Sequence, residues 1–320
     1  MDHLKQKMKP TVKVLLLVSC LTVFLVFMSG YLKDTPLSLD VGSGSPCQQC
    51  LSDDQWFAAR FNKSVEPFLS AEHTLPKDAF NWWKRLQGER GSYSAYSKTV
   101  EGLFEIVPPK PDLVEPSSYR CRTCAVVGNS GNLKGSRYGP LIDFQDVVIR
   151  MNTGRTKGYE ADVGNKTTHH IMYPESGMDL ENNTHLVLFP FKIQDLLWVT
   201  KALTTGFTGT SYMPVKSKIK ANKQLVMVIS PAFIKYVHET WLQKKGRYPS
   251  TGFMALVMAL HICDEVDVFG FGADRRGNWY HYFERLRSQK LRTGNHPGIH
   301  EYEILLQLHR QRKITYFRGW

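Results

Sequence analysis

From Cys121 to the C-terminus, short apolar runs alternate with segments of helical periodicity, and this alternation constrains the fold more than any other feature. Several runs are continuously apolar, as expected of strands that are covered on both faces. Such an alternation favours one mostly parallel sheet with helices on both sides, so we predict an α/β fold. Strands are expected within 124–128, 146–152, 184–190, 225–230, 265–272 and 313–319, and helices within 193–203, 231–243 and 251–263.

The preceding segment, residues 51–107, has a different character. It carries apolar residues at three- and four-residue spacings in DDQWFAARF, DAFNWWKRL and KTVEGLFEIV, which indicates helices. The proline-rich stretch at 108–116 ends this helical region.

The first expected strand runs into a turn of sequence GNSGN at 128–132. A strand followed by a glycine-rich turn can present backbone N–H groups to a phosphate. This turn offers asparagine amides where the common nucleotide motifs have glycine or lysine. Ligands gather at the carboxyl ends of parallel strands, so we expect a nucleotide site there; an Asn-Gly turn that only closes the strand is the alternative. The polar or glycine positions that follow expected strands are Asn129, Asn132, Asn152, Gly270 and Gly272.

The N-terminus predicts membrane attachment. Residues 14–32 contain no charged side chain and are long enough to span a bilayer. Four lysines and one aspartate precede them, and this positive flank should remain cytoplasmic. We therefore expect a type II membrane protein, and a cleaved signal peptide is the alternative. The expected parts are a cytoplasmic tail (1–13), a transmembrane signal anchor (14–32), a flexible stem (33–46) and a lumenal catalytic domain (47–320).

The chain is basic, with a formal net charge of +12. A basic surface usually suggests nucleic acid or an anionic membrane as partner. On the lumenal side of a membrane nucleic acid is excluded, so small anionic substrates are the expected partners. A basic surface that serves only solubility is the alternative.

The cysteines include two C-x-x-C pairs, Cys47/Cys50 and Cys121/Cys124. Roughly 70 residues separate the pairs, whereas the ligand pairs of compact zinc modules are about 12–20 residues apart. An oxidising lumen favours disulfides over zinc. Since Cys20 lies in the expected membrane span and five cysteines remain, one thiol is left over.

Three N-glycosylation sequons agree with a secretory compartment. We expect glycosylation at Asn62 and Asn182, and lower occupancy at Asn165, which sits in a glycine-rich turn near the expected site.

Four ordered motifs resemble those of the eukaryotic sialyltransferases. The large motif spans Cys124 to Thr168, and the small motif spans Tyr248 to Gly270. The third motif is YHYF at 280–283, and the last is H-x-x-x-x-E from His296 to Glu301. The segments DAFNWWKRLQ, TTHHIMYPES, PAFIKYV and GRYPSTG are similar to the β-galactoside α-2,3-sialyltransferases that act on Gal-β-1,3-GalNAc.

This resemblance implies a Golgi membrane enzyme with a Rossmann-like sheet, a variant of the glycosyltransferase-A type. It implies CMP-sialic acid as donor, galactose-terminated glycoproteins or glycolipids as acceptors, and no metal or other cofactor. It also implies two disulfides, Cys124–Cys263 and Cys47–Cys121, which would leave Cys50 without an obvious partner.

The resemblance further assigns roles to individual residues. His296 would be the general base, His281 would contact the donor phosphate, and Gln87 would contact the acceptor. The third motif departs from close relatives, because Tyr280 stands where they carry histidine, and this puts one donor contact in question. The residues expected to bind the donor are Asn129, Asn132, Asn152, Tyr212, Tyr248, Ser250, Gly252 and Gly272.

The chemistry agrees with these roles. CMP carries one phosphate, so hydrogen bonds and one cation could replace the divalent metal that a diphosphate donor needs. The acidic stretch 264–267 begins an expected strand, which is the wrong end for catalysis. Histidine suits a general base because its usual pKa is about 6.5, and a single base implies inversion of configuration.

Other residues and functions have simpler readings. His169, His170 and His261 stand in apolar contexts and are expected to be structural. Glu301 either orients His296 or begins a helix. A membrane-anchored lectin and a metal-dependent glycosyltransferase that uses a nucleoside diphosphate sugar are the alternative functions.

Overall fold

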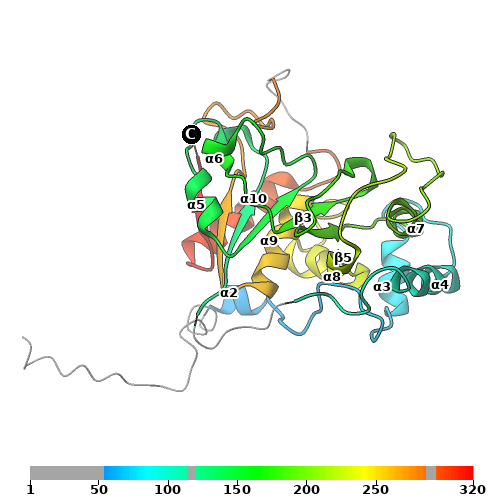
Figure 1. Cartoon of the computed structure of the whole chain (residues 1–320). Helices are drawn as coiled ribbons and strands as arrows, with labels where there is room; N and C mark the ends of the chain where they lie inside the picture. Colours follow the sequence, from blue (N-terminus) through cyan, green and yellow to red (C-terminus); the bar gives the residue numbers. More distant parts are fainter. Residues whose placement is uncertain (1–53, 114–119, 286–292, 320) are drawn as a thin grey trace, which may run out of the picture. The chain divides into compact units, whose positions relative to one another are not determined.

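A seven-stranded sheet organises the part of the chain that the computed structural model describes, namely residues 54–113, 120–285 and 293–319. Its strands are ordered β5-β4-β3-β2-β1-β6-β7, and every neighbouring pair is parallel (Figure 1). The prediction of a mostly parallel α/β sheet is therefore confirmed. The strands are β1 (Thr123–Val127), β2 (Val147–Met151), β3 (His169–Met172), β4 (His185–Leu188), β5 (Val226–Val228), β6 (Glu265–Phe269) and β7 (Thr315–Phe317).

The sequence missed only β3 among these strands, because the segment begins with two histidines. Both are buried, and burial lowers the pKa of His169 to about 3 and that of His170 to about 4. Both imidazoles are therefore neutral near pH 7, and the His169 ring stacks on that of His185 at 4.4 Å between centroids. A neutral, hydrogen-bonded imidazole fits a covered strand at little electrostatic cost.

The strand order contains a reversal of direction. From β1 the chain adds β2 to β5 on one side, and then returns to place β6 and β7 on the other side of β1. A ligand crevice is expected where the order reverses, outside the carboxyl ends of the strands, so β1 and β6 mark the place to look.

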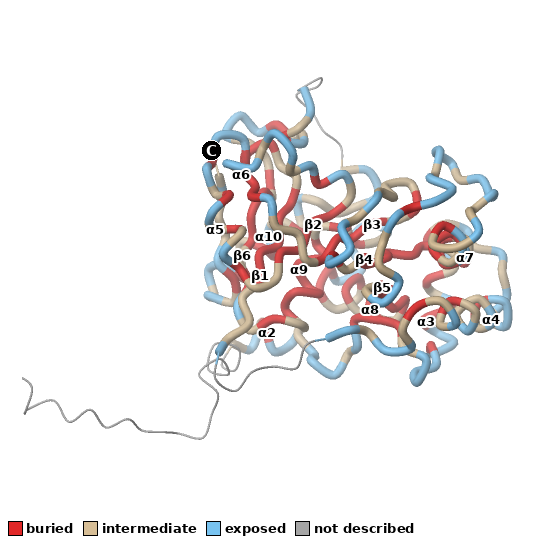
Figure 2. Tube along the Cα trace, viewed as in Figure 1, coloured by how far each residue is buried: buried red, intermediate tan, exposed pale blue. Residues whose placement is uncertain are grey.

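The helix α9 (Thr251–Ile262) lies at the centre of the molecule and packs on β1, β2, β3 and β6. Figure 2 shows most of it buried, like the strands beneath it. The expected helical segments before Cys121 are present, and α3 packs on α8 while α4 packs on α7 (Figure 1). The other α-helices are α2 (Gln55–Ala58), α3 (Lys77–Trp83), α4 (Tyr93–Phe104), α5 (Gly139–Phe144), α6 (Glu160–Val163), α7 (Ile193–Ala202), α8 (Pro231–Tyr236) and α10 (Gly298–Arg310). Short 3-10 turns occur at η2 (Gly131–Leu133), η3 (Pro174–Ser176) and η4 (Lys223–Leu225), and a π-helical turn at η5 (Val237–Trp241).

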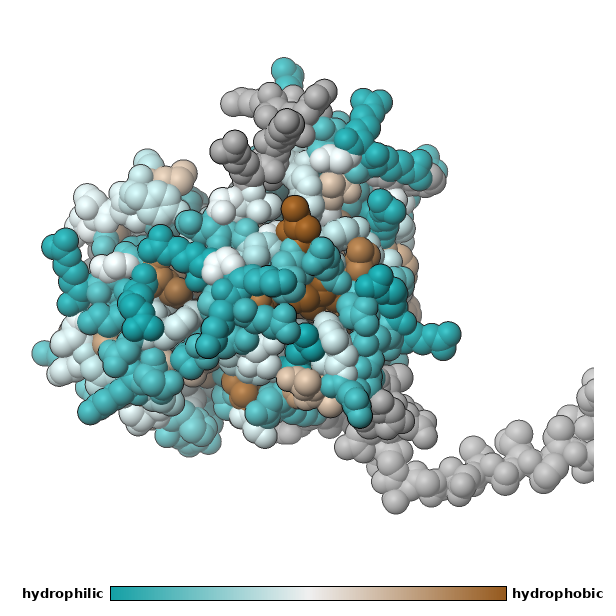
Figure 3. All heavy atoms as spheres, turned by 180° about the vertical axis from the view of Figure 1, so that it is seen from behind, coloured by the Kyte–Doolittle hydropathy of each residue, from teal (hydrophilic) through white to brown (hydrophobic). Residues whose placement is uncertain are grey.

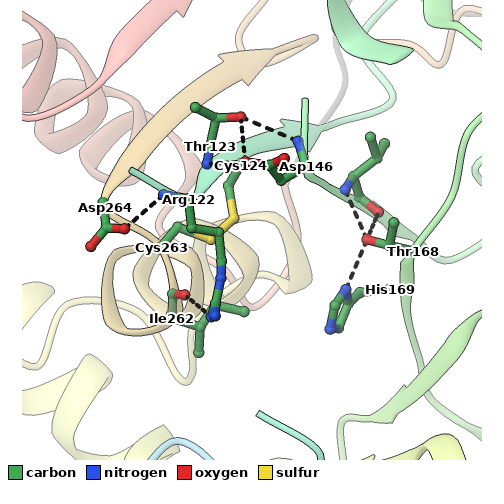
Figure 4. Close-up of a disulfide and its surroundings, with 10 residues drawn as sticks. Arg122, Thr123, Cys124, Asp146, Thr168, His169, Ile262, Cys263 and Asp264 are labelled. Carbon is green, nitrogen blue, oxygen red and sulfur yellow. Dashed lines mark hydrogen bonds between the residues drawn. A yellow bond between two sulfur atoms is a disulfide. The ribbon is translucent and has the colours of Figure 1, made fainter. Parts of the chain in front are cut away.

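The predicted disulfide between Cys124 and Cys263 is present and joins β1 to the end of α9 (Figure 4). Its two Cα atoms are 6.1 Å apart and the residues are 139 positions apart in sequence. Closing a loop of that length stabilises the fold by on the order of 4–5 kcal/mol in chain-entropy terms. Cys121 is also disulfide-bonded. Its expected partner Cys47 lies outside the described residues, as does Cys50.

Asp264 strengthens the same junction. Its Oδ2 accepts a hydrogen bond of 2.7 Å from the backbone N–H of Arg122, and the Arg122 guanidinium donates to the carbonyl of Ile262 at 3.0 Å (Figure 4). The acidic stretch 264–267 therefore lies at the amino end of β6 and ties strand to helix.

The described residues include no helix that is both long and apolar enough to cross a membrane. The expected tail, anchor and stem fall outside them. One face of the molecule is mostly hydrophilic, with hydrophobic side chains in small separate spots (Figure 3). The sequon residues Asn62, Asn165 and Asn182 are all exposed.

Candidate active site

A cavity of about 510 Å³ opens at the carboxyl ends of β1, β2 and β6. It lies at the point where the strand order reverses, and its lining residues are spread along the sequence from Gln87 to Leu305. With the exception of Asn132, all the side chains and glycines expected to bind donor or acceptor or to act in catalysis lie there together. They are Gln87, Asn129, Asn152, Tyr212, Tyr248, Ser250, Gly252, Gly272, His281 and His296.

The turn after β1 is tightly packed against the end of β6. A Cβ atom on Gly128 would lie 2.3 Å from the carbonyl oxygen of Gly270, so only glycine fits. Asn129 then turns its side chain across to β2, where Nδ2 donates to the carbonyl of Met151 at 3.1 Å. The Asn129 Oδ1 is buried and has no hydrogen-bond partner among the described residues. A buried acceptor left unpaired at a cavity wall is suited to a ligand donor.

Asn132 has a different position from the other asparagines. It is buried, and its Nδ2 donates a 2.7 Å hydrogen bond to the carbonyl of Phe271. This bond connects the turn after β1 to the loop after β6, so the side chain supports the cavity from behind and does not line it.

Asn152 is held in an unusual backbone conformation after β2. Its φ is +53°, a region that asparagine tolerates better than most residues. The backbone carbonyl accepts a 2.6 Å hydrogen bond from His170 Nε2, which carries the proton because a carbonyl can only accept. The Oδ1 accepts from the Ser176 hydroxyl at 3.2 Å, which leaves the amide Nδ2 to donate to a ligand.

The amino end of α9 forms another wall. Ser250 caps this helix by accepting from the N–H of Phe253 at 3.1 Å, and its hydroxyl donates to Glu301 Oε2 at 2.6 Å. The Ser250 N–H donates to Glu301 Oε1 at 2.7 Å. The unpaired N–H groups and dipole at the start of a helix favour an anion.

Glu301 belongs to the first turn of α10 and is buried. Burial raises its pKa to about 7, against the two Ser250 hydrogen bonds that lower it. Of the two alternatives predicted for Glu301, its position at the beginning of a helix is observed. Its carboxylate accepts hydrogen bonds from Ser250 and does not orient His296. No hydrogen bond joins Glu301 to His296 in the described structure.

His296 is partly buried at the cavity wall. Burial lowers its pKa, and the hydrogen bond to Tyr248 raises it by a smaller amount. The Nδ1 lies 3.3 Å from the carbonyl oxygen of Tyr248 and must carry the proton, so Nε2 is free to accept one. This tautomer is the one that a general base requires.

His281 is exposed at the mouth of the cavity, with Nδ1 3.0 Å from Glu284 Oε2. A β-bridge pairs His281 with Ser130 and so fixes it beside the turn after β1. Next to it, the ring of Tyr280 packs so closely on Gly131 that a Cβ there would approach it to 2.4 Å. Tyr280 thus supports the turn by contact, where the sequence had raised a question about a donor contact.

The charged groups around the cavity are few. No lysine or arginine lines it among the described residues, so the two histidines and the start of α9 are the groups that would face an anion. The described residues also contain no cluster of three or more His, Cys, Asp or Glu side chains placed to hold a metal ion.

The three histidines expected to be structural lie outside the cavity lining. His169 and His170 are buried in β3 and hydrogen-bonded. The His261 ring lies between two carbonyls, with Nδ1 2.9 Å from that of Val257 and Nε2 3.2 Å from that of Asn62, and a neutral ring donates to one of them. These expectations are confirmed. The sequence did not single out other lining residues, among them Ser130, Tyr173, Phe271 and Trp279, because their position depends on how distant loops meet.

A parallel α/β sheet with a cavity at its topological switch point is the arrangement in which α/β proteins bind ligands at the carboxyl ends of their strands. Comparison with known proteins then assigns the family: the family described as glycosyltransferase family 29 (sialyltransferase) matches residues 68–313, and the chain belongs to it. A Gallus gallus protein named CMP-N-acetylneuraminate-beta-galactosamide-alpha-2,3-sialyltransferase 1 is 48% identical over 280 residues, which cover 85% of this chain and 82% of that protein. The Homo sapiens protein of the same name is 46% identical over 85% of this chain and 82% of its own length.

A solved structure supports the assignment. The crystal structure of a mammalian sialyltransferase in complex with Gal-beta-1-3GalNAc-ortho-nitrophenol matches with a TM-score of 0.80 and 47% identity. The match covers 86% of this chain and 100% of that one. A Pan troglodytes CMP-N-acetylneuraminate-beta-1,4-galactoside alpha-2,3-sialyltransferase is more distant, at 31% identity over 80% of this chain and 72% of its own length.

Proposed function

We propose that this protein transfers sialic acid from CMP-sialic acid to the 3-hydroxyl of the terminal galactose in Gal-β-1,3-GalNAc, with inversion of configuration. The acceptor is an O-glycan, and glycolipids with the same terminus are further candidates. The observation that carries the proposal is the meeting of Asn129, Asn152, His281, His296 and Gln87 around one cavity at the switch point of the sheet. The names of the similar proteins support the same linkage and acceptor.

In the proposed reaction the galactose O3 attacks the anomeric carbon as the bond to the CMP phosphate breaks. Neutral His296 removes the hydroxyl proton at Nε2, because Nδ1 is occupied by the Tyr248 carbonyl. His281 donates a hydrogen bond to the departing phosphate from the rim of the turn after β1. One phosphate leaves with fewer charges than a diphosphate, so hydrogen bonds and the start of α9 suffice without a metal.

The donor site is assigned to the asparagines and to the start of α9. The unpaired Asn129 Oδ1 accepts from the nucleotide, and the Asn152 amide donates to phosphate or ribose. Tyr212, Tyr248, Ser250, Gly252 and Gly272 complete the donor lining. We assign Asn132 a supporting role, because its amide is already bonded to Phe271.

We also propose that the sheet is a variant of the glycosyltransferase-A type and that the enzyme is a single-pass type II protein of the Golgi membrane. Residues 14–32 would be its anchor, 33–46 its stem and 47–320 its lumenal domain. Exposed Asn62 and Asn182 would carry glycans, and a second disulfide would join Cys47 to Cys121.

The test is an assay of the full-length protein in detergent with CMP-sialic acid and a panel of galactosides, which measures CMP release and product linkage. We expect CMP release that depends on Gal-β-1,3-GalNAc and persists in EDTA. Binding of sialylated glycans without turnover would instead identify a lectin. Loss of activity in EDTA, with use of a nucleoside diphosphate sugar, would identify a metal-dependent transferase.

A further inference from the structure

A buried cluster of charges lies behind the part of the cavity wall that contains Gln87 and Tyr212. Lys192, at the start of α7, is 2.7 Å from Asp195 Oδ1 and 3.7 Å from Glu175 Oε1, measured from its Nζ. The side chains are 16%, 2% and 4% exposed, respectively. None of these three residues lines the cavity.

Burial of this charged cluster (Glu175, Lys192 and Asp195) carries a large desolvation free energy. Two carboxylates and one ammonium lose most of their hydration, and burial raises the pKa of Asp195 to about 6 even beside Lys192. Buried ion pairs of this kind add little net stability compared with apolar packing. A role in orienting other groups would explain their presence at this place.

The cluster contacts Gln87, which lines the cavity, and Ser211, the neighbour of the lining residue Tyr212. The Lys192 Nζ also lies 3.5 Å from Gln87 Oε1, on the loop after α3. The Ser211 hydroxyl donates to Glu175 Oε1, and the next residue, Tyr212, is exposed at the cavity. Gln87 follows α3 and Tyr212 follows α7, so neither residue directly follows a strand, and this cluster is a shared attachment for both loops.

The chemistry of the ammonium decides how Gln87 is oriented. Lysine has three N–H donors and no acceptor, so the Gln87 side chain must turn its carbonyl oxygen toward Lys192. The amide Nε2 is then left for the cavity as a hydrogen-bond donor. Without Lys192 the amide can rotate and can present either atom.

The loop that carries Gln87 is docked independently of this contact. Glu89 accepts from the N–H of Gly91 at 2.6 Å and from the N–H of Ile193 at 2.7 Å, and the Trp83 indole donates to the carbonyl of Pro190 at 2.9 Å. Loss of Lys192 should therefore leave the loop in place and change only the direction of the amide.

We propose that Lys192, held by Asp195 and Glu175, is a positioning residue that fixes the Gln87 amide for recognition of a neutral sugar hydroxyl of the acceptor. The inference rests on the proposed function, in which Gln87 contacts the acceptor. It assigns acceptor recognition to a residue that does not touch the substrate, and it predicts a defect confined to acceptor binding.

The experiment compares Lys192→Met, Lys192→Arg and Gln87→Ala in the full-length protein, with kcat and both KM values measured. Lys192→Met should raise the acceptor KM by about 3- to 10-fold, no more than Gln87→Ala itself, and leave the donor KM within about twofold. Lys192→Arg keeps the charge and the donors and should remain within about threefold of the parent. Lys235→Met is the matched control. Lys235, on α8, forms a similar 2.7 Å pair with Glu239 of η5, neither residue lines the cavity, and the loss of Lys235 should change neither KM.

A double variant tests whether Lys192 acts through Gln87. In a Gln87→Ala background, Lys192→Met should add less than about twofold to the acceptor KM, because the group it positions is gone. An undiminished effect in that background, or an equal rise in the donor KM, would overturn the inference. If Lys192→Met does not fold, Lys192→Met/Asp195→Asn removes one charge of each sign and replaces it in the same comparison.

Calorimetric binding of the disaccharide Gal-β-1,3-GalNAc separates this inference from the proposed function. A parent protein that binds the disaccharide but releases no CMP would refute the proposed transfer, and the Lys192 variants would still be read by their dissociation constants. Normal disaccharide binding in Lys192→Met would refute the positioning role alone.

Discussion

The two sides of the cavity are built by different means. One, here called the strand side, comprises Gly128, Asn129, Asn152, Gly270 and Gly272 at the ends of β1, β2 and β6. Short backbone turns and close glycine contacts position these residues.

The other, here called the loop side, comprises Gln87, which contacts the charged cluster, and Tyr212, whose neighbour Ser211 is hydrogen-bonded to the cluster. The backbone of the sheet therefore fixes the strand side. The loop side depends on a few polar contacts, so substitutions can alter it without unfolding the strand ends.

The largest expected effect concerns the chemistry shared by the two sides. His296→Ala should lower kcat by about 10²–10⁴-fold and leave inhibition by CMP almost unchanged, because the base acts on the acceptor proton. His281→Ala should lower kcat and also weaken CMP inhibition, since the phosphate is present before and after transfer. Near-normal turnover in His296→Ala would remove the base assignment.

The pH dependence of kcat/KM should report the same base. Burial lowers the pKa of His296 below the usual 6.5, so the active neutral form persists to lower pH than for an exposed histidine. Activity should therefore be full above that range and fall on the acid side as the imidazole becomes protonated. The acid limb should be absent in His296→Ala with residual activity; an unchanged limb would assign it to another group.

The next effect probes the strand side. Asn152→Ala removes an amide that would face the donor, and a hydrogen bond to a charged group is worth about 1.5–3 kcal/mol, or roughly 10- to 150-fold in donor KM. Asn81→Ala, at an exposed position in α3, is the control and should change neither KM. A change in the acceptor KM alone would place the nucleotide elsewhere.

Rigidity of the strand side can be tested through Gly128. Gly128→Ala introduces a Cβ that would lie 2.3 Å from the Gly270 carbonyl, and overpacking of this kind lowers the free energy of unfolding by about 1–3 kcal/mol. Gly102→Ala in α4 has open space and should stabilise the protein by about 0.5–1 kcal/mol. The melting temperatures of both variants, measured by thermal unfolding, test this difference in stability. Equal melting temperatures would show that the turn after β1 can shift to accommodate the added Cβ.

The smallest effect is expected on the loop side. Gln87→Ala should raise the acceptor KM about 2- to 12-fold, because a neutral hydrogen bond contributes about 0.5–1.5 kcal/mol. The donor KM should not change. A rise of similar size in the donor KM would show that the loop side and the strand side do not bind the two substrates separately.

The pattern of apolar residues predicts the sheet and the lining residues at the strand ends. Continuous apolar runs predict covered strands because burial on both faces demands apolar side chains at every position, and six of the seven strands followed from this pattern. Asn129, Asn152, Gly270 and Gly272 follow these strands. Because the carboxyl ends of parallel strands meet at one edge of the sheet, these residues lie together at the cavity. The resemblance to sialyltransferases added the Cys124–Cys263 pairing, which no spacing rule gives.

The other features of the site depend on contacts between residues that are far apart in the sequence, so a local sequence pattern cannot predict them. Asn129 and Asn132 are three residues apart in one turn, yet one faces the cavity and the other bonds Phe271, because the direction of a turn side chain depends on a partner 139 positions away. Strand β3 was not predicted because its two histidines resemble polar, ionisable residues in the sequence. They become neutral, and compatible with a covered strand, only when the folded sheet buries them. Glu301 is hydrogen-bonded to Ser250, which is 51 residues away in the sequence, and Lys192 contacts Gln87, which is 105 residues away. Hydrogen bonds and charges act between atoms within a few ångströms, and only the folded chain brings such distant residues that close.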